Sequence, residues 1–448
     1  GVTGGVSRVV RLLGLFLFSA LLMAGAWPME PLAPDPLVIY DSPRPKRICP
    51  RSPGILRLDD GRLIMTMEYS QGGSKRVPGI KQTEDGKYYR GRVLVSDDGG
   101  ETVRETSNHP LYQARPFVAG DRIYLLGHYN DLGVIYSEDR GATWSEAAWL
   151  TSGQEWHQAP CNVHYAHGRV YLVMERHTVP IRKYWPVFSI APVVLSAPVD
   201  ADLTKRTSWT FSNEVTFVEM VQKIDTMITG IGVPFYAPGP TVPGESLMRS
   251  RPMAPPGWLE THIVTFPDPE HMWHDPEGRT LYLWMRAHTG TTNFACIAKA
   301  VEDEEHNITV GPAEAPSGKR ILYVPCPGGH LKFHILYDSV SKLYWLASNQ
   351  STDSMTHPKH LPESRYGLPD NERHRLVLHF SKNCIDWCFA GLIVKTGDPK
   401  QARSYPAMAF DGQDLLVLSR SGDKRAANAH DGNLLLLHRI KDFRKLAY

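Results

Sequence analysis

The chain has 448 residues, of which 42% are hydrophobic and 21% are charged, proportions typical of a globular protein with a substantial core. Its formal net charge of +2 gives no electrostatic reason to expect nucleic acid or an acidic membrane as a partner. Glycine and proline, at 37 and 35 residues, suit a fold made of many short strands joined by turns.

The N-terminal segment has the pattern of an export signal. Arg8 and Arg11 supply positive charge, residues 12–23 are mostly apolar, and Ala24-Gly25-Ala26 is a small-residue cleavage sequence. The apolar run is short for a membrane-spanning helix. We therefore expect cleavage after Ala26, a secreted or periplasmic protein formed by residues 27–448 as one domain, and no stable membrane insertion. An uncleaved membrane anchor is the alternative.

Strand-like runs follow one another through the rest of the chain. They are short, rich in apolar and β-branched residues, and bounded by turn sequences such as Asp59-Asp60-Gly61. Representative runs cover residues 62–67, 122–126, 169–174, 280–285, 375–380 and 415–419. No long amphipathic helix is evident, so the sequence predicts an all-β protein.

One short pattern occurs twice, 41 residues apart. The pattern Ser-x-Asp-x-Gly-x-Thr occupies residues 96–102 and again residues 137–143, where Trp144 follows. Each copy comes directly after a strand-like run. Aspartate accepts hydrogen bonds from turn amides and glycine reaches backbone angles that other residues avoid, so each copy predicts a hairpin turn. A repeat at this spacing is typical of propeller blades.

This pattern resembles the Asp-box, or BNR repeat, of the sialidase-like β-propellers. A degenerate third copy begins at Ser381, with Asn383 at the aspartate position and Trp387 near its end. The resemblance implies a β-propeller of four-stranded blades, with the Asp-boxes as structural turns on its outer rim. At about 50–60 residues per blade, the chain predicts six to eight blades, with six or seven favoured.

Further segments resemble the sialidase family and imply where a substrate binds. Arg51-Ser52-Pro53 is similar to the Arg-x-Pro motif of the first sialidase blade. Sialidases bind the carboxylate of their sugar with three arginines, because a guanidinium group matches a carboxylate with two hydrogen bonds. Arg286 and Arg420, each at the end of a strand-like run, are candidates to complete such a triad. Lys332 is a further candidate for contact with a carboxylate, against a plain position in a strand.

The candidate catalytic residues are His128, His157 and Glu260. The two histidines lie at junctions of strands and loops, where propeller sites are built, and Glu260 lies two residues after Trp258, where an aromatic neighbour can raise a carboxyl pKa. The chain also resembles propeller polysaccharide lyases and rhamnosidase-like enzymes that act around uronic acids. In a lyase an arginine such as Arg286 neutralises the uronate, and a histidine removes the adjacent proton.

The sequence demands no metal ion and no organic cofactor, and a calcium or zinc ion in the axial channel stays open as an alternative. None of the six cysteines forms a Cys-x-x-Cys pair, so we expect buried free thiols rather than a zinc cluster. His164 and His167 have the spacing of a metal pair, but His167-Gly168 is more typical of a hairpin turn.

Taken together, these features predict a secreted carbohydrate-active enzyme. The favoured activity is that of a sialidase-like glycoside hydrolase acting on a glycan or polysaccharide that bears a sialic or uronic acid. Two alternatives stay open: a polysaccharide lyase acting on a uronic-acid glycan through histidine or tyrosine and arginine, and a glycan-binding propeller without catalytic activity.

Overall fold

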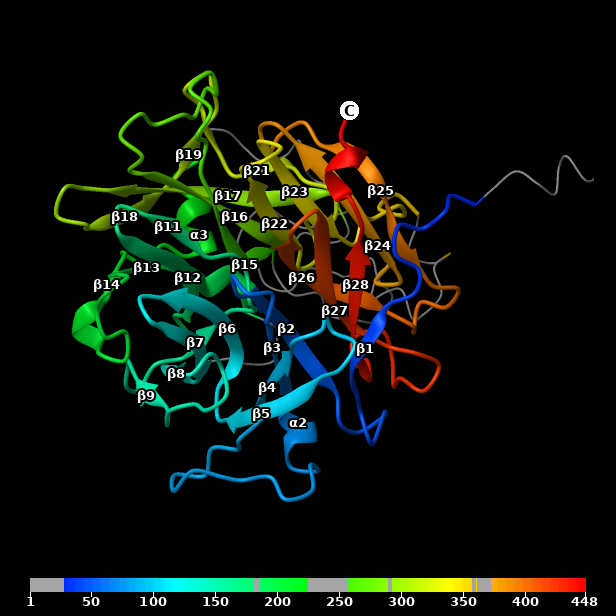
Figure 1. Ribbon diagram of the computed structural model, residues 1–448. Helices are drawn as coiled ribbons and strands as arrows, with labels where there is room; N and C mark the ends of the chain where they lie inside the picture. The colour runs from blue at the N-terminus through cyan, green and yellow to red at the C-terminus, as the bar shows by residue number, and fades with distance from the viewer. Residues whose placement is uncertain (1–27, 180–185, 225–255, 289–291, 357–359, 361–371) are drawn as a thin grey trace, which may run out of the picture.

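The computed structural model describes residues 28–179, 186–224, 256–288, 292–356, 360 and 372–448, so the expected export signal lies outside the described residues. Within this part of the chain the strands form six sheets of mostly four antiparallel strands, which follow one another around a ring (Figure 1). The predicted all-β propeller is confirmed, and it has six blades. No helix among the described residues is long and apolar enough to cross a membrane.

The first three blades follow the chain from residue 50 to residue 211. The first comprises β2 (Pro50–Arg57), β3 (Leu63–Tyr69), β4 (Gly91–Ser96) and β5 (Arg104–His109). The second comprises β6 (Tyr112–Ala119), β7 (Arg122–Tyr129), β8 (Asp131–Ser137) and β9 (Ala148–Trp149). The third comprises β10 (Trp156–His157), β11 (His164–Ala166), β12 (Arg169–His177), β13 (Ile190–Pro198) and β14 (Thr210–Phe211).

The other three blades complete the ring. The fourth comprises β15 (Gly257–Val264), β16 (Thr280–His288), β17 (Phe294–Glu302), β18 (Ile308–Gly311) and β21 (Tyr323–Pro325), beside a hairpin of β19 (Ala313–Glu314) and β20 (Arg320–Ile321). The fifth comprises β22 (His334–Asp338), β23 (Leu343–Ser348), β24 (Arg375–Ser381) and β25 (Cys388–Lys395). The sixth comprises β26 (Arg403–Asp411), β27 (Asp414–Ser421), β28 (Leu434–Ile440) and β1 (Leu37–Asp41).

Helices are few and short among the described residues. They are α2 (Gln71–Ser74), α3 (Phe217–Val221) and the 3-10 turns η1 (Val187–Ser189), η2 (Arg206–Ser208) and η7 (Phe443–Leu446). The α3 helix begins with a capping box, in which Thr216 and Glu219 each accept a hydrogen bond from the other's backbone amide.

The two ends of the chain meet in the sixth blade. The N-terminal strand β1 pairs antiparallel with β28 and forms the outer strand of a sheet whose other members come from the C-terminus. Apolar side chains fill the spaces between neighbouring blades: Leu63 and Met65 of the first blade pack in one cluster with Leu416 and Leu418 of the sixth. Strand pairing and apolar burial therefore close the ring at the same junction.

Both Asp-boxes form the same turn, between the third and fourth strands of neighbouring blades. In the second copy the Gly141 amide donates to Ser137 Oγ, and the Thr143 amide donates to Asp139 Oδ1, each at 2.8 Å. The first copy repeats both hydrogen bonds at 2.8 Å between β4 and β5. Gly141 has a φ of +88°, and a Cβ at this position would lie 2.8 Å from Ile64 of the first blade, so this glycine allows the turn to approach its neighbour.

The degenerate third copy lies in the corresponding turn of the fifth blade. The Asn383 side chain accepts a hydrogen bond from the Asp386 amide at 2.9 Å, as an Asp-box aspartate does from its turn amides. The expectation that the two Asp-boxes lie in equivalent turns of neighbouring blades is confirmed, and the degenerate copy occupies the same turn of a more distant blade.

Replacing Asp139 by alanine is expected to lower the melting temperature by a few degrees, because the turn amide and hydroxyl of Thr143 lose their acceptor. Thermal unfolding of the purified variant measures this. Glu101→Ala, at an exposed position of the first Asp-box turn, is the control and should leave the melting temperature unchanged. An Asp139→Ala protein as stable as the wild type would contradict the structural role of the turn.

The predicted free thiols are confirmed. All six cysteines are free, and all but the partly exposed Cys388 are buried. Among the described residues no group of three or more histidine, cysteine or acidic side chains could hold a metal ion.

Candidate functional site

A cavity of about 450 Å³ lies where the inner strands of several blades converge. Its walls come from β2, β6, β10, β15 and β26, together with the ends of the second strands and Arg373 before β24. A cavity of this size accepts a small ligand such as a sugar residue. We call it the central pocket.

Each of four inner strands carries a β-bulge beside this pocket. The bulged residues Ser52, Gln113, Glu260 and Tyr405 have positive φ angles of 38°, 52°, 61° and 53°. A positive φ at a residue other than glycine costs roughly 1–3 kcal/mol. Bulges next to active sites commonly redirect a side chain, and here the same device recurs in four blades.

In three blades the second strand carries a pocket side chain at the same register position, directly opposite the inner strand where the bulge begins. His128, Arg286 and Arg420 each pair with the inner-strand residue just before the bulge in the second, fourth and sixth blades. All three side chains line the central pocket. The repeated register thus brings residues that are far apart in the sequence to one cavity.

Tyr405, Glu260 and Arg286 form a buried hydrogen-bonded group. The Tyr405 hydroxyl donates to Glu260 Oε1 at 3.2 Å, and Arg286 Nη1 donates to the same oxygen at 2.7 Å. Arg286 Nη1 also lies 3.3 Å from the Tyr405 hydroxyl, and its Nε donates to the His330 carbonyl. Burial, followed by the charge of Glu260, raises the pKa of Tyr405, so the hydroxyl keeps its proton next to a carboxylate that can accept it.

Two more arginines surround the Tyr405 ring. The guanidinium carbon of Arg420 lies 4.0 Å from the ring centroid, and that of Arg373 lies 5.6 Å away. Arg420 is only 3% exposed, and its Nε and Nη2 atoms meet no hydrogen-bond acceptor among the described residues. Burial lowers the pKa of Arg420. A buried cation lacking an anionic partner is costly, so this side of the pocket is suited to an anion.

Arg51 lies at the edge of the pocket and is already paired. Its Nη2 atom forms an ion pair with Asp431, which also contacts the His430 ring at 3.0 Å and the Asn428 side chain at 3.3 Å. The His430 hydrogen bond and the Arg51 charge hold the pKa of Asp431 well below its usual range. The pair fixes the orientation of the Arg51 guanidinium.

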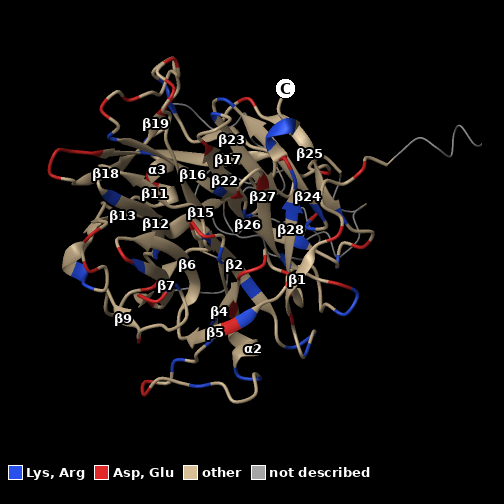
Figure 2. Cartoon of the chain, viewed as in Figure 1, with Lys and Arg blue, Asp and Glu red and all other residues tan. Residues whose placement is uncertain are grey.

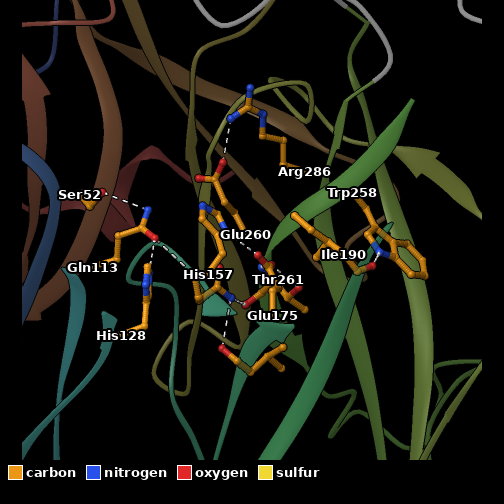
Figure 3. Close-up of polar contacts among 12 residues, drawn as sticks. Ser52, Gln113, His128, His157, Glu175, Ile190, Trp258, Glu260, Thr261 and Arg286 are labelled. Carbon is orange, nitrogen blue, oxygen red and sulfur yellow. Dashed lines mark hydrogen bonds and ion pairs between the residues drawn. The ribbon is translucent and has the colours of Figure 1, made fainter. Parts of the chain in front are cut away.

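Histidines from the second and third blades form another part of the pocket wall (Figure 3). His157 Nδ1 lies 2.8 Å from Glu175 Oε2, and His128 Nε2 lies 2.8 Å from the Gln113 amide oxygen. Glu175 is 0% exposed, and its other oxygen accepts from the amide and hydroxyl of Thr261. This fixed carboxylate orients the His157 ring.

The rings beside His157 are held neutral. Burial, followed by the charge of His157, places the pKa of His128 well below its ordinary value and lowers that of His177 to about 3. The ring centroids of these two lie 6.2 and 5.9 Å from that of His157. His128 and His177 therefore carry no charge at neutral pH.

Most of the residues predicted from the sequence meet at the pocket. Those that line it are Arg51, Arg286, Arg420, His128 and His157. Glu260 lies directly behind the lining and contacts Arg286. Lys332 is not among the lining residues: it is buried, and its ammonium group donates to the carbonyl of Pro406, next to the lining residue Tyr405. This placement does not support the expected contact of Lys332 with a substrate carboxylate.

Several pocket residues were not predicted, among them Tyr405 and Arg373. A sequence pattern could have pointed to Tyr405, because Tyr405 precedes a proline just as Ser52 precedes Pro53. In the structure both of these residues have positive φ angles at the bulge of an inner strand. Arg373 has no comparable signal, since it precedes β24 outside any recognisable motif.

No protein-family model and no curated protein matches the chain. Solved structures do match it. A Hadza microbial sialidase has a TM-score of 0.52 at 13% identity, over 91% of this chain and 68% of that one. Trypanosoma rangeli sialidase, in complex with 2,3-difluorosialic acid, has a TM-score of 0.51 at 10% identity, over 92% of this chain and 60% of that one. The chain has the sialidase-like propeller fold. An α-L-arabinanase of Penicillium chrysogenum complexed with arabinobiose has a TM-score of 0.47 at 12% identity, over 91% and 98% of the two chains.

The central pocket of this sialidase-like propeller is strongly cationic. The arginines that line it are Arg51, Arg90, Arg286, Arg373 and Arg420, whereas Glu155 is the one lining carboxylate among the described residues. Glu260 and Asp431 lie behind the lining, and each pairs with one arginine. The positive charge that remains attracts an anionic ligand.

Proposed function

We propose that this protein is a glycoside hydrolase that removes a sugar bearing a carboxylate from a glycan. The observation that carries the proposal is the Tyr405–Glu260 hydrogen bond beside the buried guanidinium group of Arg420. Sialidases are glycosidases that use a tyrosine as nucleophile. A neutral tyrosine approaches a carbon that bears a carboxylate with less repulsion than a second carboxylate would meet.

Each step has a residue suited to it. Arg420 and Arg373 bind the sugar carboxylate, and Tyr405 attacks the anomeric carbon while Glu260 accepts its proton. His157, held by Glu175, donates a proton to the leaving oxygen. Water then attacks the glycosyl–tyrosine bond with His157 as the base, and Glu260 returns its proton to Tyr405. Arg286 positions Glu260 and the tyrosine hydroxyl.

The His157–Glu175 pair also favours a second candidate, a polysaccharide lyase. An imidazole oriented by a buried carboxylate can remove the proton beside a uronate carboxylate that an arginine neutralises. Elimination then breaks the bond to the leaving oxygen and leaves a double bond in the sugar. In this reaction Tyr405 has no covalent role.

Turnover on a panel of sialylated and uronate-containing glycans separates these functions. Free acidic sugar indicates the hydrolase, and absorbance of an unsaturated uronide indicates the lyase. Binding without either product indicates a glycan-binding propeller. A fluorinated acidic glycoside that traps the intermediate should place its mass on the peptide containing Tyr405. Hydrolysis with the adduct on another residue would contradict the proposed nucleophile.

Replacing Glu175 by glutamine is expected to lower kcat by about 100-fold for a glycan with a poor leaving group, because the His157 ring that donates the proton loses the buried carboxylate that orients it. An aryl glycoside, whose leaving group needs no proton, should be cleaved almost normally. Melting temperatures check that the variant folds, and Glu214→Gln, at an exposed ion pair with Arg176, is the control. An equal loss on both substrates would show that Glu175 acts only in folding.

A further inference from the structure

A second cavity adjoins the central pocket. It has a volume of about 330 Å³ and shares Arg51 and Gln71 with the pocket, so the two spaces lie next to each other on either side of these residues. The loop before β2 forms one wall and the α2 turn forms the other. A glycan whose terminal sugar occupies the pocket can therefore extend its next residue into this second space.

The second cavity is basic. Lys46, Arg47 and Arg76 line it, all three side chains are exposed, and none forms an ion pair with a described residue. Asp431, the one carboxylate that lines it among the described residues, is already paired with Arg51. Figure 2 shows blue segments beside α2 and in the loop near β1, whereas charges of both signs alternate over most of the other loops.

The backbone holds these cations in place. The amides of Arg47 and Ile48 both donate to the Arg44 carbonyl, at 2.8 and 2.9 Å, which closes the loop into a turn. The α2 turn packs against this loop, since a Cβ added to Gly73 would lie 3.1 Å from the Arg47 carbonyl oxygen. The amide of Arg76 donates to the Gly73 carbonyl at 2.9 Å. Two separate segments are thus fixed with their basic residues around one space.

We propose that this basic cavity binds an anionic group on the sugar next to the one in the central pocket, so that the substrate is a polyanionic glycan. The inference rests on the proposed function and names its substrate class. Guanidinium and ammonium groups bind a carboxylate or a sulfate ester through the same charge-assisted hydrogen bonds, so either group fits. Because the three cations are exposed, the attraction weakens as salt rises.

The test compares three substrates with the same acidic terminal sugar, linked to a neutral sugar, to a uronate or to a sulfated sugar. The wild type should show a kcat/KM about tenfold higher on at least one charged substrate at low salt, and this preference should shrink at high salt. The triple variant Lys46→Ala, Arg47→Ala and Arg76→Ala should lose the preference and cleave the neutral substrate normally. A triple variant at the exposed Lys81, Lys205 and Lys319 removes the same charge elsewhere and should behave as the wild type.

The uronate and sulfate arms identify which anion the cavity prefers. Equal rates on all three substrates in the wild type would overturn the proposal, as would an unchanged preference in the triple variant. Calorimetric binding of a sulfated or uronate oligosaccharide to the Tyr405→Phe protein separates this inference from the proposed function. If no glycan is hydrolysed, loss of that binding in the triple variant still supports the cavity, and unaltered binding refutes it.

Discussion

Replacing Tyr405 by phenylalanine is expected to lower kcat by about 10⁴-fold or more, because the attacking hydroxyl is removed. Binding of the acidic sugar should change little. The ring that stacks on Arg420 at 4.0 Å is retained, and the Glu260–Arg286 ion pair keeps its hydrogen bond of 2.7 Å. Steady-state kinetics measure kcat, and calorimetry with the free acidic sugar measures the dissociation constant.

Tyr112→Phe is the matched control. Tyr112 lines the same pocket, and its ring also lies against a guanidinium group, with Arg90 at 4.1 Å. Loss of its hydroxyl should leave most of kcat, since no catalytic carboxylate is bonded to it in the way that Glu260 is bonded to Tyr405. Wild-type turnover in Tyr405→Phe, or an equal loss in the two variants, would remove Tyr405 from the mechanism.

The free energy of unfolding is expected to fall steeply as the pH drops below about 6.5. Burial lowers the pKa of His109, His288 and His330 to about 3, and that of His379 and His438 to about 4. Unfolding exposes these rings to water, where each gains a proton near pH 6.5. The unfolded state therefore binds more protons between pH 6.5 and 4, and stability is lost as the pH falls through this range.

The expected size of this effect is large. Each buried histidine contributes up to about 1.4 kcal/mol per pH unit, and five together approach about 7 kcal/mol per unit as an upper limit. Domains are commonly stable by only about 5–15 kcal/mol, so unfolding near pH 5 is expected. Urea titrations at pH 7.5, 6.5 and 5.5 measure the slope.

Two variants test the origin of the slope. His438→Gln should lower the number of protons taken up on unfolding by about one, because this buried ring is no longer present to titrate. His167→Gln, at an exposed position, should leave it unchanged. A free energy of unfolding that stays constant from pH 7.5 to 5.5 would mean that these histidines are protonated in the folded protein.

The fold could be predicted because the Asp-box turn is a local device. The residues at 96–102 and 137–143 contain their own hydrogen-bond donors and acceptors, so the repeat alone implied equivalent hairpins. The number of blades could not be predicted in this way, because it depends on a contact between strands that are far apart in the sequence. The pairing of β1 with β28 joins segments at opposite ends of the chain, and nothing within either strand specifies its partner.

The same distinction applies to the site. Arg286, Arg420 and His128 could be found because the ends of strands carry side chains to the pocket at one repeated register position. The Tyr405–Glu260 pair joins residues 145 positions apart. It depends on two bulges with positive φ angles, which the alternation of residues in a strand does not predict. Lys332 is also buried, but its ammonium group donates to a backbone carbonyl.

The antiparallel pairing of β1 with β28 also governs when the molecule can be completed during synthesis. Residues 37–41 emerge from the ribosome long before their partner at residues 434–440. Until then the growing chain has an unpaired edge strand at each end, which is a template for association with other chains. Blades one to five can form in order as they emerge, whereas the sixth must wait until β28 has emerged. A chain whose synthesis stops before β28 therefore has a nearly complete ring that is prone to aggregate.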